Sequence, residues 1–267
     1  MSWIDRALAR PGIKRLARGA THWVDLQGSY LETQLEQIAP RSRGALLDVG
    51  CGEKPYESIF TPFVTSYVGI EHEGTYGQTM SSSRASKPDL YYDGTRLPFA
   101  DHSFDTVLNV QVLEHTATPQ DLLHEMARVL RKDGILILNA PFCFRLHEEP
   151  HDYFRYTPHG LRDMCSRAGL EVTDVLAQGS LWSVLGHKLN SYLAFQVAEL
   201  GGVSQTLGKL GHEAVTRKGP RLWSLPVVLP TMACVSGGAR VLDRILPDAT
   251  EALSFLVLAR PTAPLAP

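Results

Sequence analysis

A short apolar run near residue 50 ends in two glycines one residue apart, in the sequence Leu46-Leu47-Asp48-Val49-Gly50-Cys51-Gly52. Glycine carries no Cβ, so the backbone can come close to a ligand, and the helix start expected just beyond offers free N–H groups. A strand, a glycine turn and a helix in this order predict a nucleotide site. The pair alone does not identify the nucleotide. The dinucleotide pattern has a third glycine where Pro55 stands, and no Gly-Lys-Ser/Thr of a P-loop follows.

Polar side chains stand at the ends of successive apolar runs along the chain. Asp48 lies near the end of the first run, and Glu71, Asp93 and Asn109 lie at or just beyond the ends of the next three. Ligands of parallel α/β sheets bind outside the carboxyl ends of the strands. We therefore expect these four side chains to converge on one crevice.

A second group of reactive side chains lies between residues 140 and 158, in a loop dense in His, Tyr and Arg. A positioned base helps to remove the proton when the hydroxyl group of an alcohol or phenol substrate reacts. An aromatic wall would help to hold such a substrate. Histidine and tyrosine could supply both, although tyrosines more often pack and a histidine can simply begin a helix. The candidate catalytic residues are His147, His151, Tyr153 and, after the fourth strand, His115.

The same loop contains residue types that bind metals, at His147, Glu148, His151 and Asp152. Two histidines across a loop broken by prolines are not a clear zinc site, and Mg²⁺ prefers oxygen ligands. We therefore assign no metal ligand, and the sequence leaves metal dependence open.

Apolar runs of strand length alternate with helical patterns, which favours a parallel α/β sheet. A helix over 119–130 has Leu122, Leu123, Met126, Val129 and Leu130 on one side, and Gly134 is expected to close it. The other expected helices cover 23–38 and 159–168. The expected strands cover 45–49, 66–70, 89–92, 104–110, 135–138, 171–177 and 253–259.

The order of these motifs resembles that of the class I S-adenosylmethionine-dependent methyltransferases, in particular their small-molecule branch. The resemblance runs through residues 44–140 and includes Asp93-Gly94-Thr95-Arg96-Leu97-Pro98-Phe99, Val112-Leu113-Glu114-His115 and the stretch from Glu125 to Gly134. It implies an α/β Rossmann-like fold, with a mostly parallel seven-stranded sheet and helices on both faces. We expect an N-terminal helical arm at 1–40 and a methyltransferase domain at 41–267. A helical insertion at 179–247, a lid or an interface, would precede the last strand.

The resemblance also implies which residues hold the cofactor, S-adenosyl-L-methionine. The turn at Gly50 and Gly52 would carry its methionine part, with the amino group near Asp48. Glu71 would accept from both ribose hydroxyls. The remaining assignments are Asp93 to the adenine amino group, a Gly94 or Thr95 N–H facing the ring, and Asn109 and Val110 along the cofactor near its sulfonium. Each of these carboxylates could instead be a structural residue that caps a helix or forms a turn.

The expected reaction is O-methylation of a small molecule, a sugar or a natural-product intermediate, in a biosynthetic role. The loop at 139–157 resembles one in methyltransferases that modify cell-surface polysaccharides and sugars. Two alternatives stay open: a lipid-linked or polysaccharide acceptor, and a non-catalytic protein that binds S-adenosylmethionine or serves in assembly. Asn109-Val110-Gln111-Val112 lacks the Asn/Asp-Pro-Pro-Tyr of enzymes that methylate amino groups of nucleic acids.

The whole chain has 267 residues, 44% of them hydrophobic, and a net charge of -2. No overall basic field attracts nucleic acid, so none is expected as a partner. Four scattered cysteines without a CxxC pair favour a reduced, cytoplasmic protein. A basic arm at 1–20 lacks the apolar core of a signal peptide.

The insertion at 179–247 is rich in apolar residues, but no run reaches the about 18 that a membrane span needs. Pro226 and Pro230 are expected to break its richest segment. A lid over the acceptor, a homodimer face and a membrane-surface patch all remain open.

Overall fold

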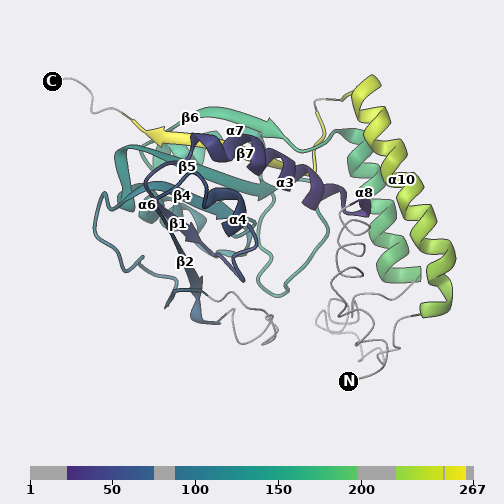
Figure 1. Ribbon diagram of the computed structural model, residues 1–267, viewed down its shortest axis with the longest axis horizontal. Coiled ribbons are helices and arrows are strands. Elements are labelled where there is room, and N and C mark those ends of the chain that lie inside the picture. The colour runs from purple at the N-terminus through teal and green to yellow at the C-terminus, as the bar shows by residue number, and fades with distance from the viewer. Residues whose placement is uncertain (1–22, 75–87, 198–220, 249, 263–267) are drawn as a thin grey trace. The chain divides into compact units, whose positions relative to one another are not determined.

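The computed structural model describes residues 23–74, 88–197, 221–248 and 250–262 (Figure 1). They fall into two compact units. One contains the described residues up to Leu31 and those from Gly179 to Leu253, and the other contains the rest. The basic arm expected at 1–20, and most of the polar loop expected at 73–88, lie outside the described residues.

The larger unit is built on a seven-stranded sheet with the order β3-β2-β1-β4-β5-β7-β6. All neighbouring strands are parallel except β7, which is antiparallel to both β5 and β6. This confirms the predicted Rossmann-like, mostly parallel sheet. The strands are β1 (Ala45–Val49), β2 (Ser66–His72), β3 (Leu90–Tyr92), β4 (Phe104–Val110), β5 (Leu130–Pro141), β6 (Leu170–Ala177) and β7 (Ser254–Pro261).

Strand order reverses at the centre of the sheet, because the chain moves outward from β1 through β2 and outward the other way from β4 through β5. Right-handed crossovers in opposite directions place the connecting helices on opposite faces. Helix α4 (Glu57–Phe60) therefore covers one face and α6 (Pro119–Val129) the other. Helix α7 (Pro158–Arg167) lies beside α6, since Gln120 Nε2 donates to the carbonyl of Met164 at 3.1 Å.

The core follows the predicted periodicities. In α6, Leu122, Leu123, Met126 and Val129 are buried, as expected from their spacing. Helix α7 starts after Thr157, whose hydroxyl accepts from the N–H of Gly160 at 3.0 Å. The remaining helical segments of this unit are η1 (Ala39–Arg41), η2 (Leu113–His115) and the later part of α3 (Leu26–Ile38).

The prediction that Gly134 closes the helix before β5 is wrong. Helix α6 ends at Val129, and β5 already begins at Leu130 and runs through Gly134. Arg131 holds the start of this strand against β4, since its Nη1 donates to both carboxylate oxygens of Asp105 at 2.8 Å. The glycine serves close packing, because a Cβ on it would lie 2.6 Å from Leu130 Cδ1.

The smaller unit is helical and contains α8 (Leu181–Tyr192), the π-helical turn η3 (Leu193–Val197), η4 (Leu222–Ser224) and α10 (Leu225–Ile245). Asp243 on α10 is its polar centre. Its carboxylate accepts from Tyr30 Oη at 2.9 Å, from Ser180 Oγ at 2.5 Å, and from the hydroxyl of Ser183. One carboxylate thus joins α10 to α8 and to the start of α3.

The prediction that Pro226 and Pro230 break the richest apolar segment is also wrong. Helix α10 runs without interruption for 21 residues. Pro226 stands in the first turn, where no intrahelical donor is needed. Pro230 does cost a hydrogen bond, which burial of Val228 and Met232 in an apolar cluster offsets. By length and composition, α10 could cross a membrane, and only 22% of its most apolar window is buried.

Candidate functional site

The turn after β1 has the backbone that its glycines predict. Gly50 and Gly52 have φ values of +76° and +52°, in the left-handed region that glycine adopts without strain. A Cβ on Gly50 would lie 2.3 Å from Val112 Cγ2, so the turn also packs against the segment after β4. The N–H groups of Gly50 and Cys51 both donate to the carbonyl of Ile70, at 2.8 and 3.1 Å, and fix the turn to β2.

Asp48, on β1 just before this turn, is only 2% exposed. Tyr67 on β2 donates its hydroxyl to Asp48 Oδ2 at 2.5 Å. Burial raises the pKa of Asp48 to about 7, against the lowering effect of this hydrogen bond. The site therefore holds a carboxyl group that a cation from a ligand would convert to its ionised form.

Glu71 closes the site from the end of β2. Its Oε2 accepts from the N–H of Gly52 at 2.8 Å, and its Oε1 accepts from the N–H of His72 at 2.9 Å. Burial raises its pKa, and these backbone donors lower it. The structure thus brings Asp48, Gly50, Gly52 and Glu71 together, as the sequence predicts.

Asp93 and Gly94 lie just beyond β3, the neighbour of β2 in the sheet. Asp93 Oδ1 accepts from the N–H and the hydroxyl of Thr95, at 2.9 and 2.6 Å, and these bonds lower its pKa. Gly94 has φ +82°, and a Cβ there would lie 2.8 Å from His72 Cδ2. Asp93 is therefore a turn former at the same sheet edge as Glu71.

Asn109 and Val110 end β4, on the other side of the switch in strand order. Asn109 is fully buried, and its Nδ2 donates to the carbonyl of Val49 at 3.0 Å. This bond joins the two central strands where they reach the glycine turn. Asn109 Oδ1 is buried and has no hydrogen-bond partner in the described structure, and Val110 is 8% exposed.

Lys54 is a residue that the sequence analysis missed. Its ammonium donates to Asp89 Oδ2 at 2.5 Å, its side chain is 6% exposed, and its φ is +52°. The ion pair ties the glycine turn to the residue before β3. A lysine two residues after Gly52 was the available signal, but only the fold shows that Asp89 is its partner.

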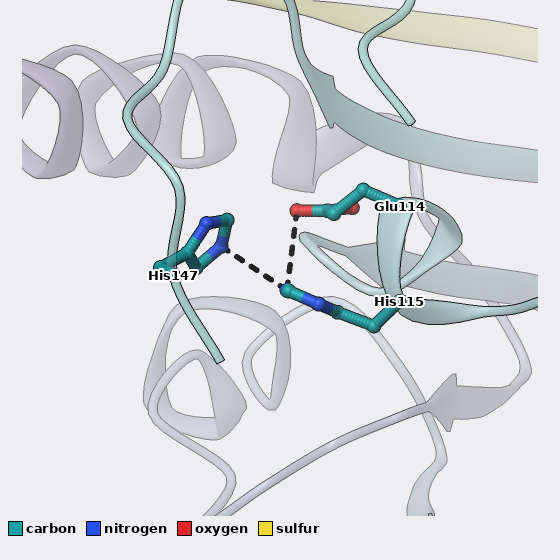
Figure 2. Close-up of side chains that lie close together, drawn as sticks. All are labelled: Glu114, His115 and His147. Atoms are coloured by element: carbon teal, nitrogen blue, oxygen red, sulfur yellow. Dashed lines mark hydrogen bonds and ion pairs between the residues drawn. The ribbon is translucent and has the colours of Figure 1, made fainter. Parts of the chain in front are cut away.

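A cluster of three side chains forms after β4, shown in Figure 2. His115 Nε2 lies 3.1 Å from His147 Nε2 and 3.8 Å from Glu114 Oε1. Glu114 is fully buried, neither of its carboxylate oxygens has a hydrogen-bond partner in the described residues, and burial raises its pKa to about 8. The motif Leu113-Glu114-His115 contained this glutamate, but its spacing gave no reason to single it out.

His147 reaches this cluster from the loop after β5. Its backbone N–H donates to Asp152 Oδ2 at 3.0 Å, and its Nδ1 lies 3.2 Å from the same oxygen. Arg155 donates to both oxygens of Asp152, at 2.5 and 2.7 Å. Burial, together with the charge of His115, lowers the pKa of His147.

The four predicted catalytic residues divide into two pairs. His115 and His147 lie in the partly buried cluster, whereas His151 and Tyr153 are exposed and contact each other, with 2.9 Å between His151 Nδ1 and the Tyr153 hydroxyl. In the described structure a backbone contact joins the two pairs, since His115 Nδ1 lies 3.0 Å from the carbonyl of His151. Beside it, the Tyr153 N–H donates to the carbonyl of Glu114. The catalytic roles of these four residues stay predictions.

Comparison with known proteins agrees with this geometry. Residues 47–138 match the family model described as a methyltransferase domain. An uncharacterized methyltransferase of Mycolicibacterium vanbaalenii is 36% identical over 96 residues, which cover 35% of this chain and 38% of that protein. Another, of Mycobacterium marinum, is 34% identical over 112 residues, 41% of this chain and 43% of that protein. The matched segment thus spans about two fifths of each relative.

Solved structures share the fold at low identity. The [4+2]-cyclase SpnF has a TM-score of 0.52 and 18% identity, over 87% of this chain and 81% of its own. An S-adenosylmethionine-dependent methyltransferase of Mesorhizobium loti has a TM-score of 0.50 and 12% identity, over 88% of this chain and 99% of its own.

Residues 47–138 therefore resemble a methyltransferase domain, and the sheet around them has the fold of the S-adenosylmethionine-dependent methyltransferases. The residues present fit the cosubstrate of this class. Gly50 and Gly52 leave the backbone open to its methionine part, and buried Asp48 can pair with its ammonium group. Glu71 offers a pure acceptor to two hydroxyl donors.

Proposed function

We propose that the chain transfers a methyl group from S-adenosylmethionine to an oxygen of a small molecule, a sugar or a natural-product intermediate. The observation that carries the proposal is the set of imidazole and phenol groups beside the cosubstrate residues. Val112 contacts Gly50, and two residues later Glu114 and His115 begin the cluster that His147 completes. Groups that handle protons thus lie at the same sheet edge as the glycine turn.

Methyl transfer from a sulfonium is an in-line displacement, so the protein acts mainly by proximity and alignment. Bound S-adenosylmethionine supplies the electrophilic methyl group. Asp48 would hold the ammonium end and Glu71 the ribose hydroxyls, and both are fixed by hydrogen bonds in the described structure. Such fixed acceptors favour one orientation of the cosubstrate.

A hydroxyl acceptor must lose its proton as the new bond forms. We assign this step to His151, because its ring is exposed and its Nδ1 lies 2.9 Å from the Tyr153 hydroxyl. With the proton on Nδ1 donated to the tyrosine oxygen, Nε2 is the free acceptor. Replacement His151→Ala should lower kcat while the affinity for S-adenosylhomocysteine stays within twofold. A drop in that affinity instead would assign His151 to the cosubstrate.

Calorimetric titration tests the cosubstrate. S-adenosylhomocysteine should bind at micromolar concentration and NAD should not bind, and binding of neither would overturn the proposal. A labelled-methyl screen across sugars, acids and phenols then tests the acceptor class. Binding of S-adenosylhomocysteine without methyl transfer to any of these acceptors would favour the non-catalytic alternative.

A lipid-linked acceptor is the second candidate, and α10 is the observation that favours it. Trp223, Val227 and Ile245 at or near its ends are 79%, 71% and 64% exposed, on a helix apolar enough to enter a membrane. Pelleting with phosphatidylglycerol vesicles should carry the protein down, and Val227→Asp with Ile245→Asp should release it. If the protein stays in the supernatant, the lipid-linked acceptor is rejected and a water-soluble acceptor is favoured.

A further inference from the structure

The two imidazole rings of the cluster point lone pairs at one another. His115 Nδ1 lies 3.0 Å from the carbonyl of His151, and a carbonyl only accepts, so this nitrogen carries the proton. His147 Nδ1 lies 3.2 Å from the carbonyl of Arg145 and 3.2 Å from Asp152 Oδ2, again two acceptors. These hydrogen-bond networks assign the neutral rings as Nδ1–H tautomers. The two Nε2 atoms, 3.1 Å apart, are then both unprotonated.

The carboxylate of Glu114 brings a third lone-pair donor close to the two Nε2 atoms. Its side chain is fully buried, and neither oxygen has a hydrogen-bond partner in the described residues. A buried carboxyl group without a donor is costly, and an ion is one of the few groups that can compensate it. Glu114 Oε1 faces His115 Nε2 at 3.8 Å, on a residue that the chain places directly beside His115 (Figure 2).

We propose that Glu114, His115 and His147 bind a divalent transition-metal ion of the zinc type. One ligand atom from each side chain lies within 4.8 Å of the other two. Ligands about 2.0–2.1 Å from a tetrahedral zinc are about 3.3 Å apart, so the imidazole pair is already near that spacing. The carboxylate needs only a small side-chain rotation. Two histidines and a glutamate are also a known donor set of catalytic zinc sites, which keep one position open.

The surroundings have the form that metal ligands require. Histidines that bind metals donate their other ring N–H to a carbonyl or a carboxylate, which fixes the tautomer and the ring. His115 has the carbonyl of His151 in this position, and His147 has Asp152. Asp152 is itself held by two hydrogen bonds from Arg155.

The donor set also selects the ion. Imidazole nitrogens suit zinc and its neighbours in the first row, whereas Mg²⁺ prefers a shell of oxygens. The open position would bind water or an acceptor oxygen and raise its acidity. This last role rests on the proposed function, whereas metal binding itself does not.

Zinc binding to the whole chain tests the site. After treatment with a chelator and dialysis, calorimetry with ZnCl₂ should show one ion per chain, and CoCl₂ should give the visible absorption of imidazole-bound cobalt. His147→Ala and Glu114→Gln should each weaken zinc binding at least tenfold. His159→Ala is the matched control, an exposed histidine of the same unit, and should bind as the parent does. Circular dichroism checks that each variant is folded.

Absence of stoichiometric zinc binding, or equal affinity in the parent and both variants, would overturn the metal site. A proton shared between the two rings, the simplest other arrangement, would give this negative result. If neither variant folds, the parent decides: one tetrahedral cobalt ion per chain supports the site, and no ion or an octahedral ion overturns it. S-adenosylhomocysteine binding is measured on the same zinc-free protein. Its loss would defeat the proposed function, and its retention without zinc binding would defeat only the metal site.

Discussion

Asp48 and Glu114 are two carboxyl groups buried in one sheet unit, and their surroundings differ in a way that suits two kinds of cation. Asp48 accepts a hydrogen bond from Tyr67, while Glu114 accepts none that the described structure shows. Burial raises the pKa of both, to about 7 and about 8. An ammonium group offers hydrogen bonds as well as charge and suits the first. A metal ion offers charge at a short distance and suits the second.

Asp48 should make the stability of the ligand-free protein fall as the pH rises from about 4 to about 7. Its pKa is about 7 in the folded chain, against 3.8 for an aspartate free in water, so the folded state keeps a proton that the unfolded state has lost. The stabilisation is therefore complete below the unfolded pKa and is lost as the pH rises through the folded one. Urea denaturation at pH 5 and pH 7 should show this loss.

Asp48→Asn removes the titration and is the direct check. The parent also contains Glu71 and Glu114, whose pKa values are raised too, so its own pH slope is not specific to one group. The difference between Asp48→Asn and the parent isolates Asp48. Equal pH slopes for the two proteins would show that Asp48 is ionised throughout.

Glu71→Ala should weaken S-adenosylhomocysteine binding by about 1–3 kcal/mol, because two hydroxyl donors would lose a buried charged acceptor. Part of the loss comes from the turn, since Gly52 N–H also loses its acceptor. Glu73→Ala, an exposed carboxylate two residues on, is the matched control. Calorimetry measures both, and equal affinities would remove Glu71 from the cosubstrate site.

Among the elements, the glycine turn depends most on its sequence. Gly50→Ala places a Cβ 2.3 Å from Val112 Cγ2 at a φ of +76°. The left-handed backbone alone costs about 1–2 kcal/mol for an L-residue. The steric contact adds to that cost.

Unfolding in urea should therefore show Gly50→Ala to be less stable than the parent by at least that amount. Val112→Ala in the same chain should return the steric part and leave the backbone part. No recovery in the double variant would mean that the contact with Val112 does not limit the turn.

The sequence predicts the sheet better than the helices around it. The continuous apolar runs at 135–138 and 253–259 are typical of buried strands. The structure places the first in β5 and the second, from Ser254 onward, in β7. The sequence predicts a helical insertion at 179–247 but not the unbroken helix α10, because proline normally interrupts a helix, although apolar burial can offset its cost. In the sequence, Gly134 resembles a helix end because glycine commonly follows a helix. In the structure it lies inside β5, where a Cβ would lie 2.6 Å from Leu130 Cδ1.

The site divides in the same way. Asp48, Gly50, Gly52 and Glu71 were predictable because strand ends meet at one edge, whatever the side chains between them. The pairing of His115 with His147, 32 positions apart, and of Lys54 with Asp89 depends on how loops fold back. Spacing within one loop suggested His147 with His151, whereas the structure pairs His147 with a histidine after another strand.

The two compact units of the chain contain different functional groups. All the residues proposed to bind the cosubstrate or the metal ion belong to the sheet unit, and Asp243 belongs to the helical one. Asp243 accepts from Tyr30, Ser180 and Ser183, on segments far apart in sequence. A change at Asp243 should therefore act on the stability of its own unit and leave the affinity of the other unit for its ligand.

Asp243→Ala should lower the free energy of unfolding of the helical unit by about 1–3 kcal/mol, because three hydroxyl donors lose their carboxylate acceptor. Denaturation followed by the fluorescence of Trp182, whose Nε1 bonds the carbonyl of Leu246 in this unit, would report the change. Asp248→Ala, which removes only the turn bond to Thr250, is the control. S-adenosylhomocysteine affinity, measured by calorimetry where the chain is folded, should stay within twofold in both variants. A large loss of affinity in Asp243→Ala would show instead that the helical unit takes part in cosubstrate binding.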